Sequence, residues 1–310
     1  MNAVEAVFGA TMLAQTVRMA IPYACAAVGG VWSERSGVVN IALEGILLAG
    51  AFAAVAAHLA TGSAWVGLLA GCVAGAALAG AHAVVVVFGR ANAIVSGIAI
   101  NLAAAGGTRF LLRWLFASSS NSPPVDAFRV PLFAGTTGAA FLSRALTDPL
   151  TLLTAALVAW TAWTLRSTRF GLRVRACGED PAAAASVGIR VSAVRVAAVT
   201  LGGAVAGLGG VALAYDEHQF QSGMSGGRGF IALAAVILAG WRPVRAAAAC
   251  LAFAVLDALQ VVIQGRAAGT GGYLAQMLPY VATLVALGVI AGRRRAGAVE
   301  GRPPAALGQP

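Results

Sequence analysis

The sequence contains no lysine and few charged residues of any kind. Only 10% of its 310 residues are charged, whereas a soluble domain usually carries about 25%. So few charges could not cover the surface of a water-soluble globule of this length. A soluble protein with an Ala-rich helical core would need polar faces along its helices, and long stretches of this sequence have none. The deficit of charge therefore predicts an integral membrane protein.

Motifs of catalytic and metal sites are absent as well. Because the chain lacks lysine it has no P-loop, so it cannot bind and hydrolyse ATP through a Walker-type site. The histidines form no HExxH motif, and GxSxG does not occur. The cysteines lie far apart without a CxxC spacing, which favours small buried hydrophobic residues over disulfides or metal ligands. We predict neither an enzyme nor a metal or cofactor bound by this chain.

What the sequence does contain is long apolar segments, with a mean hydropathy of +0.84. A membrane-spanning helix needs about 20 such residues. We predict an all-α integral membrane protein, a polytopic helical bundle of about nine (eight to ten) transmembrane helices. The predicted segments are 8–30, 41–60, 64–88, 93–116, 148–166, 193–214, 229–241, 246–263 and 275–292.

The seventh segment is short and suggests a half-helix or a re-entrant element. It contains Ile231–Gly240 (IALAAVILAG), which echoes Ile41–Gly50 (IALEGILLAG). In the predicted topology the two stretches run in opposite directions, as the inverted repeats of many transporters do. In a sequence so rich in Ala, Leu and Gly, chance also explains the echo.

The distribution of arginine predicts the orientation. If the N-terminus lies outside, most loop arginines fall on one side of the membrane, which the positive-inside rule assigns to the cytoplasm. The C-terminus then lies inside, unless the seventh segment fails to cross, in which case half of the topology inverts. The arginine-rich loops are 31–40, 89–92, 167–192, 242–245 and 293–310.

We interpret residues 1–299 as one transmembrane domain and residues 300–310 as a disordered tail. The loop 117–147 is expected outside, and 167–192 is the longest cytoplasmic insertion.

The cytoplasmic insertion specifies a short helix. Asp180 is a good N-cap, Pro181 suits the first helical position, alanines follow, and Gly188 can end the helix in the left-handed conformation. A helix at the membrane interface would carry large apolar residues on one face, and this one does not. A helix with so small a surface is therefore better suited to docking into a groove of another protein.

The stretch FGLRVRACGEDPAAAASVGI resembles the cytoplasmic coupling segment of permease subunits of bacterial ABC importers. More narrowly, it resembles the ribose, simple-sugar and nucleoside permease family, which is related to branched-chain amino-acid permeases. Three further blocks agree and stand in the expected order. They are SERSGVVNIALEG (Ser33–Gly45), ANAIVSGIAINLAAAG (Ala91–Gly106) and GGRGFIALAAVILAGWRP (Gly226–Pro243). The match looks closest to the nucleoside-type permeases.

This resemblance implies a multi-pass permease in the bacterial cytoplasmic membrane without an ATPase of its own. A partner ATP-binding subunit would bind ATP and Mg, and an extracytoplasmic substrate-binding protein would deliver the ligand. A second homologous permease would complete a heterodimer or a homodimer. The ligand would be a nucleoside or a simple sugar, with pentoses, hexoses and branched-chain amino acids left open. The residues carried over to the coupling contact are Gly178, Glu179, Asp180, Pro181, Ala182, Ala183, Gly188 and Ile189.

Polar residues within or near the predicted spans are candidates for the substrate pathway, because ionisable groups in a membrane are costly and usually functional. The alternative is that the carboxylates pair with buried arginines or cap broken helices, and that the amides form interhelical hydrogen bonds. The candidates are Asn40, Glu44, Asn92, Ser96, Asn101 and Asp257.

Two other functions compete with the importer subunit. An ion-coupled secondary transporter would act alone, with Glu44 or Asp257 carrying the coupling ion. A membrane scaffold would transport nothing, although charges within the spans and the four blocks argue against it. Uptake by the purified single chain under an ion gradient would favour the secondary transporter.

Overall fold

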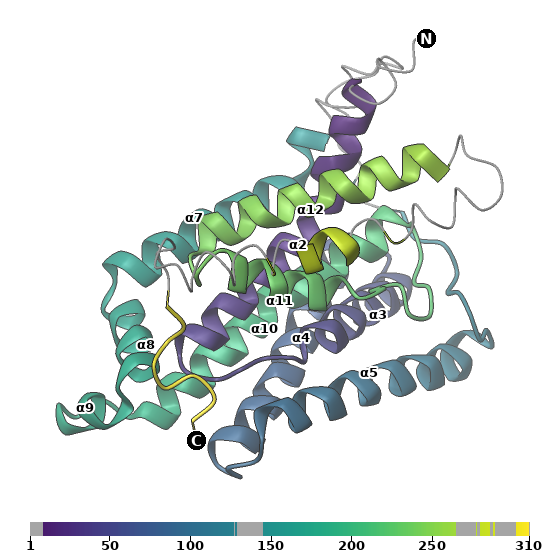
Figure 1. Cartoon of the computed structure of the whole chain (residues 1–310). Helices are drawn as coiled ribbons and strands as arrows, with labels where there is room; N and C mark the ends of the chain where they lie inside the picture. The colour runs from purple at the N-terminus through teal and green to yellow at the C-terminus, as the bar shows by residue number, and fades with distance from the viewer. Residues whose placement is uncertain are drawn as a thin grey trace.

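The computed structural model describes residues 9–126, 128, 145–264, 277, 280–285, 288 and 302–309. Over these residues the chain is helical and has no strand longer than a single antiparallel bridge between Asn121 and Gln221. The helices pack into one bundle (Figure 1). Their bounds are α2 Ala10–Arg35, α3 Leu43–Thr61, α4 Ala64–Val87, α5 Ala93–Phe116, α7 Pro149–Ser167, α8 Arg169–Glu179, α9 Pro181–Ser186, α10 Val191–Asp216, α11 Arg228–Leu238 and α12 Pro243–Gln264.

Eight of the nine predicted segments coincide in position with a described helix. The ninth, 275–292, lies mostly outside the described residues. Five helices are long and apolar enough to cross a membrane, namely α3, α4, α5, α10 and α12. The helices α2 and α7 have sufficient lengths of 26 and 19 residues but are less apolar. The all-helical prediction is therefore confirmed, while the number of crossings stays a prediction.

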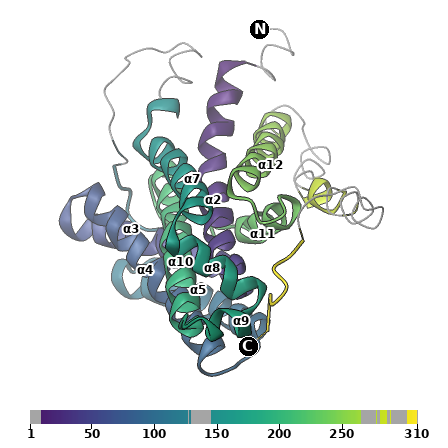
Figure 2. The ribbon, with the colours of Figure 1, turned by 90° about the vertical axis from the view of Figure 1, so that its left-hand side faces the viewer.

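The buried helix α10 forms the centre of the bundle, in contact with α2, α3 and α4. In Figure 2, α3 and α4 lie to one side of it and α11 and α12 to the other. Glycines bring the backbones together: a methyl group on Gly207 would overlap the carbonyl oxygen of Gly71 in α4, and one on Gly202 would overlap that of Gly29 in α2. Small residues permit such close approach where lipid offers no hydrophobic drive for association.

The helix α11 is short and apolar, as the seventh segment predicted. Its 11 residues extend about 16 Å at 1.5 Å per residue, too short for a hydrocarbon core of about 30 Å. Turns at residues 217–227 precede it, and its C-terminal end reaches the last turn of α2. There Arg35 Nε donates to the Trp241 carbonyl oxygen over 3.0 Å, and Trp241 Nε1 donates to the Glu34 carboxylate.

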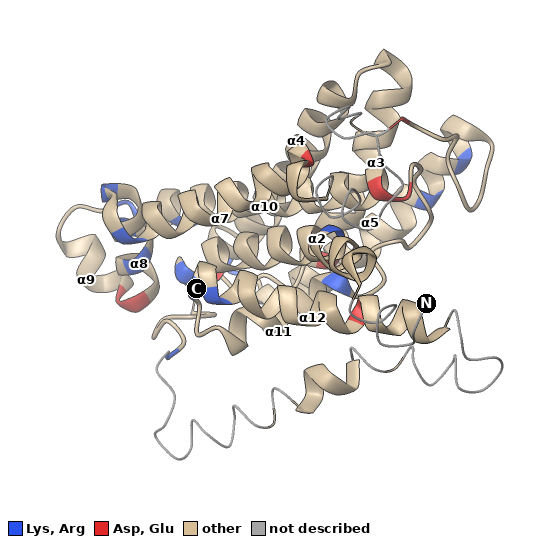
Figure 3. Ribbon diagram, turned by 90° about the horizontal axis from the view of Figure 1, so that it is seen from above, with Lys and Arg blue, Asp and Glu red and all other residues tan. Residues whose placement is uncertain are grey.

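Residues 217–241 therefore connect the two ends of the bundle despite the short helix. At the far end, Asp216 at the end of α10 pairs with Arg18 near the start of α2. At the near end, Trp241 meets Glu34 and Arg35. Whether this stretch crosses the membrane, and with it the orientation of the termini, stays a prediction. Arginines gather at the end of the bundle that carries α8 and α9 (Figure 3).

Residues 302–309, within the segment predicted as a disordered tail, lie against the bundle in the structure. The Ala306 amide donates to the Gly178 carbonyl oxygen and the Gly308 amide to the Gly37 carbonyl oxygen, both over 2.9 Å. Arg195 Nη1 donates to the Gln309 carbonyl oxygen over 3.1 Å, and Ala306 is only 2% exposed. The tail thus joins the turn after α2 to the end of α8 and the start of α10. Its small residues allow this close fit, which composition alone did not indicate.

The glycine contacts of α10 can be tested by a matched pair of substitutions. Gly207→Ala should destabilise the bundle by about 1–3 kcal/mol, because its methyl group overlaps the backbone of α4. Gly106→Ala lies in open space on α5 and should be neutral or stabilising, because alanine favours the helix. Thermal unfolding in detergent measures both. Equal melting temperatures for the two variants would contradict the packing role.

Candidate functional site

The local structure of the predicted coupling helix is confirmed in α9. Asp180 Oδ1 accepts a hydrogen bond from the Ala183 amide over 2.9 Å, and Pro181 occupies the first position. Gly188 ends the helix with a φ of +82°, and the Ile189 amide donates back to the Ala184 carbonyl oxygen over 3.1 Å. Each of these capping contacts joins residues that are close in the sequence, which is why the sequence predicts them.

The outer surface of α9 is small and exposed. Ala182 and Ala183 are exposed, and Val187 beside them is 74% exposed, whereas Ala184 packs inward. Figure 1 shows α9 protruding from the end of the bundle. A low, apolar protrusion of this kind can enter a groove on another protein.

Gly178 and Glu179, just before α9, contact the rest of the bundle instead. A side chain at Gly178 would overlap the Arg35 carbonyl oxygen, and the Gly178 carbonyl oxygen is held by the tail. Glu179 lies 3.9 Å from Arg35 and also accepts from the Ala305 amide over 3.3 Å. The set carried over from the family thus divides into two residues that contact α2 and the tail, Gly178 and Glu179, and the residues of α9 and its C-terminal turn.

Two of the candidate pathway asparagines organise the start of α3. Asn40 Oδ1 accepts from the Ala42 amide over 3.1 Å. Asn101 on α5 donates to the Ile41 carbonyl oxygen over 2.9 Å and accepts from the Gly45 amide over 2.8 Å. These amides satisfy backbone groups that have no partner where a helix begins inside the bundle.

Glu44 performs the same task for α11. Its two carboxylate oxygens accept from the amides of Gly227 and Gly229, each over 2.7 Å. The positive end of the helix dipole favours a carboxylate at this position. Glu44 is thus a cap of a broken helix, which was the structural alternative for this residue.

Asn92 and Ser96 lie together at the start of α5, where they line one pocket, and neither lines the cavity at Asp257. Asn92 caps α5 by accepting from the Ile94 and Val95 amides over 2.9 and 3.2 Å. Ser96 Oγ lies 3.0 Å from His82 Nδ1, and His82 Nε2 lies 3.0 Å from the Val39 carbonyl oxygen. His82 thereby links α4, α5 and the segment before α3, a role that sequence reasoning did not find.

Asp257 on α12 lies at a cavity of about 240 Å³. Tyr23 Oη on α2 donates to it over 2.5 Å, and Arg228 and Tyr280 line the same cavity. Asp257 is the one pathway candidate that contacts this cavity. Sequence reasoning missed Tyr23 because a lone tyrosine in an apolar segment also suits packing.

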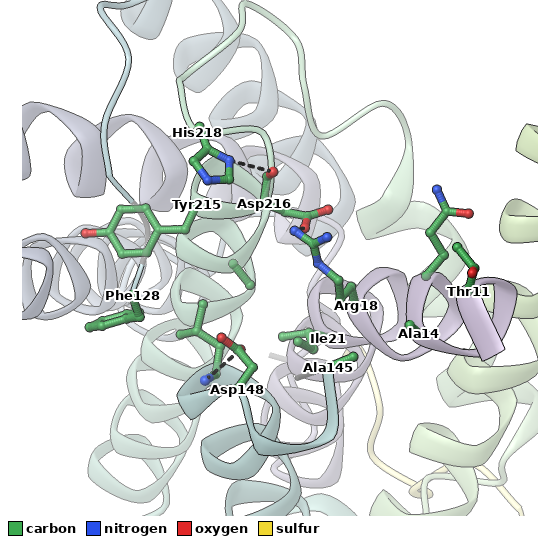
Figure 4. Close-up of a pocket in the computed structure, with 13 residues that line it drawn as sticks. Thr11, Ala14, Arg18, Ile21, Phe128, Ala145, Asp148, Tyr215, Asp216 and His218 are labelled. Carbon is green, nitrogen blue, oxygen red and sulfur yellow. Dashed lines mark hydrogen bonds and ion pairs between the residues drawn. The ribbon is translucent and has the colours of Figure 1, made fainter. Parts of the chain in front are cut away.

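A second cavity, of about 370 Å³, lies where α10 ends and α2 and α7 begin (Figure 4). Arg18 and Asp216 form an ion pair across it. Asp148 caps α7 by accepting from the Leu150 amide over 3.0 Å, and His218 bonds to the Asp216 backbone. Its ionic groups are thus paired within the chain.

Residues 12–292 match the family model described as the permease component of the branched-chain amino acid transport system. The chain belongs to this family. It is 36% identical to the nucleoside ABC transporter permease protein NupC of Lactococcus lactis, over 90% of this chain and 92% of that one. It is 34% identical to the guanosine ABC transporter permease protein NupQ of Bacillus subtilis, over 93% and 94%. It is 36% identical to the putative glucose ABC transporter permease protein TsgC13 of Haloferax volcanii, over 82% and 78%. No solved structure matches the chain.

The protein is therefore a membrane permease subunit of an ABC importer, a multi-pass protein of the inner membrane. It is not itself an enzyme, because a partner subunit hydrolyses ATP. The family also implies a substrate-binding protein. The secondary transporter is not favoured, and Glu44, one of the two residues proposed to carry an ion, is already bound to two backbone amides.

The cap on α11 yields a prediction. Glu44→Ala leaves the Gly227 and Gly229 amides without acceptors and should cost about 2–4 kcal/mol. Hydrogen exchange of peptides covering residues 227–231 should accelerate strongly. The matched control Glu217→Ala removes an exposed glutamate after α10 and should leave this exchange unchanged. Unchanged protection in Glu44→Ala would show that the carboxylate does not hold α11.

Proposed function

We propose that the chain imports a nucleoside or a simple sugar. Relatives named for nucleoside and guanosine transport align with more than nine-tenths of the chain, which supports a nucleoside as the preferred substrate. The relative named for glucose aligns with less of the chain, but its identity to the chain is the same 36% as that of NupC. Recognition of a hydroxylated ring is common to both substrate classes.

In this proposal the exposed, capped helix α9 carries the mechanism. A cytoplasmic ATP-binding subunit, which binds ATP and Mg, receives the surface formed by Asp180, Pro181, Ala182, Ala183, Gly188 and Ile189. Gly178 and Glu179 transmit its movement to α2 and to the tail. A rigid-body shift of the bundle then alternates access.

The topology in this proposal has about nine crossings. The N-terminus is outside and the C-terminus inside. The gathering of arginines around α8 supports this orientation by the positive-inside rule. The start of α3 meets the start of α11 at Glu44, which supports treating the two echoing stretches as equivalent parts of an inverted repeat.

The proposed assembly contains a second permease, either a homologous chain or another copy of this one. An extracytoplasmic substrate-binding protein delivers the ligand to the end of the bundle opposite α9. That end carries the loop bridged at Asn121 and Gln221. The pathway is supported by side chains that fix helix ends, namely Asn40, Glu44, Asn92 and Asn101. Ser96 supports it through its contact with His82, and Asp257 faces the substrate.

The coupling role is tested by co-purification. The tagged chain should retain the ATP-binding subunit, and either Asp180→Arg or Ala183→Arg should reduce the retained amount at least tenfold. Each change places a long cation on the α9 surface, and Asp180→Arg also removes the cap. Ser120→Arg, on an exposed loop remote from α9, should retain the subunit fully.

Two results would contradict the coupling role. One is full retention in both α9 variants, and the other is no association in the wild type.

A further inference from the structure

The cavity between α2, α11 and α12 has the composition of a ligand site. Tyr23, Arg228, Asp257, Gln260 and Tyr280 line it, together with apolar side chains. The three helices lie side by side in Figures 1 and 2. Most of its polar groups thus come from three helices that cross one another within the bundle, where charged groups are costly unless they serve a function.

The polar groups in this cavity are only partly satisfied by the protein. Tyr23, 2% exposed, donates one hydrogen bond to Asp257, and a carboxylate can accept several. Arg228 Nη1 donates to the Met224 carbonyl oxygen over 2.9 Å, but its buried Nε has no partner among the described residues. Donor and acceptor capacity therefore remains open toward the cavity.

A purely structural role would pair the two charges directly. Within the part of the chain that the structure describes, Asp257 accepts from Tyr23 and Arg228 donates to the Met224 carbonyl oxygen, and no ion pair joins Arg228 to Asp257. The two residues instead face a common space of about 240 Å³. A separated cation and anion with room between them are arranged to bind a third group.

The chemistry of that group follows from the lining. One positive and one negative residue select a ligand without net charge. A carboxylate accepts hydrogen bonds from neighbouring hydroxyls, and the guanidinium and the Gln260 amide can donate to ring or hydroxyl oxygens. The Tyr280 hydroxyl donates to the Gly226 carbonyl oxygen over 2.9 Å, which holds its half-exposed ring at the edge of the cavity. Such a ring can stack on a base or on a sugar face.

We propose that this cavity binds the vicinal diol of a neutral hydroxylated ring, as found in ribose or a hexose, with Asp257 accepting from both hydroxyls. This inference rests on the proposed function and adds to it the place and chemistry of recognition within the permease.

The test uses a reporter at the cavity. Val261 lines it and is 40% exposed, so Val261→Cys provides a thiol that a maleimide can label in the detergent-solubilised complex without its binding protein. Guanosine should slow the labelling. 2′-Deoxyguanosine, which lacks one hydroxyl, should need at least a tenfold higher concentration for the same protection. Slowing by glucose with no effect of guanosine would identify a hexose as the source of the diol.

Substitution of Asp257, the proposed hydrogen-bond acceptor, distinguishes a role in ligand binding from a structural role. In the same background, Asp257→Asn should weaken protection by guanosine at least tenfold and abolish the preference over 2′-deoxyguanosine. Asp126→Asn, an exposed aspartate in the loop after α5, should preserve both. If Asp257→Asn fails to assemble, Arg228→Gln repeats the measurement and should weaken protection by both guanosine compounds.

Failure of this inference is distinct from failure of the proposed function. If the wild-type complex takes up guanosine with ATP but neither guanosine nor glucose slows labelling at position 261, the substrate binds elsewhere and the inference is wrong. If the wild-type complex performs no ATP-dependent uptake of either compound, the proposed substrate class fails, and this assignment fails with it.

Discussion

The fold depends on one constraint: a helix that begins inside a lipid-embedded bundle must find acceptors for its first amides there. Water is absent from the hydrocarbon core, so each unpaired backbone group would cost several kcal/mol. Glu44 supplies both carboxylate oxygens to the first turn of α11, and Asn101 supplies its amide to the start of α3. This arrangement fixes the first turn of α11 and with it the position of Arg228 at the cavity. Stability and recognition are therefore joined at the same residues.

Close backbone packing around α10 couples the movement of one end of the bundle to that of the other end. Because its glycines touch the backbones of α2, α3 and α4, these helices cannot slide independently without overlap. The start of α10 is also tied to the segment after α2, where Arg195 Nε donates to the Ser36 carbonyl oxygen over 3.2 Å. A push on α8 and α9 thus reaches a tightly packed core rather than a single helix.

Features set by neighbouring residues could be predicted from the sequence, and features set by distant residues could not. Helix positions follow from hydropathy, and α9 follows from Asp180, Pro181 and Gly188, whose partners lie within a few residues. Glu44 was a pathway candidate because it is an ionisable residue in a predicted span. Its partners in α11 could not be identified from the sequence, because they stand more than 180 positions away and no local pattern reveals them. The contacts of the tail could not be predicted for the same reason, because its amides donate to the carbonyl oxygens of Gly37 and Gly178, more than 120 positions away.

The contacts of Glu44, Asn101 and Trp241 also bear on how the sequence can change. Ser33–Gly45, Ala91–Gly106 and Gly226–Pro243 look like three separate motifs, but these contacts make them one interlocked unit. Gly229 leaves no space for a side chain, because a methyl group there would overlap the backbone of Glu44. If one block is exchanged between related permeases, the chain should fold correctly only when the other two blocks are exchanged with it. The three segments are therefore expected to change together.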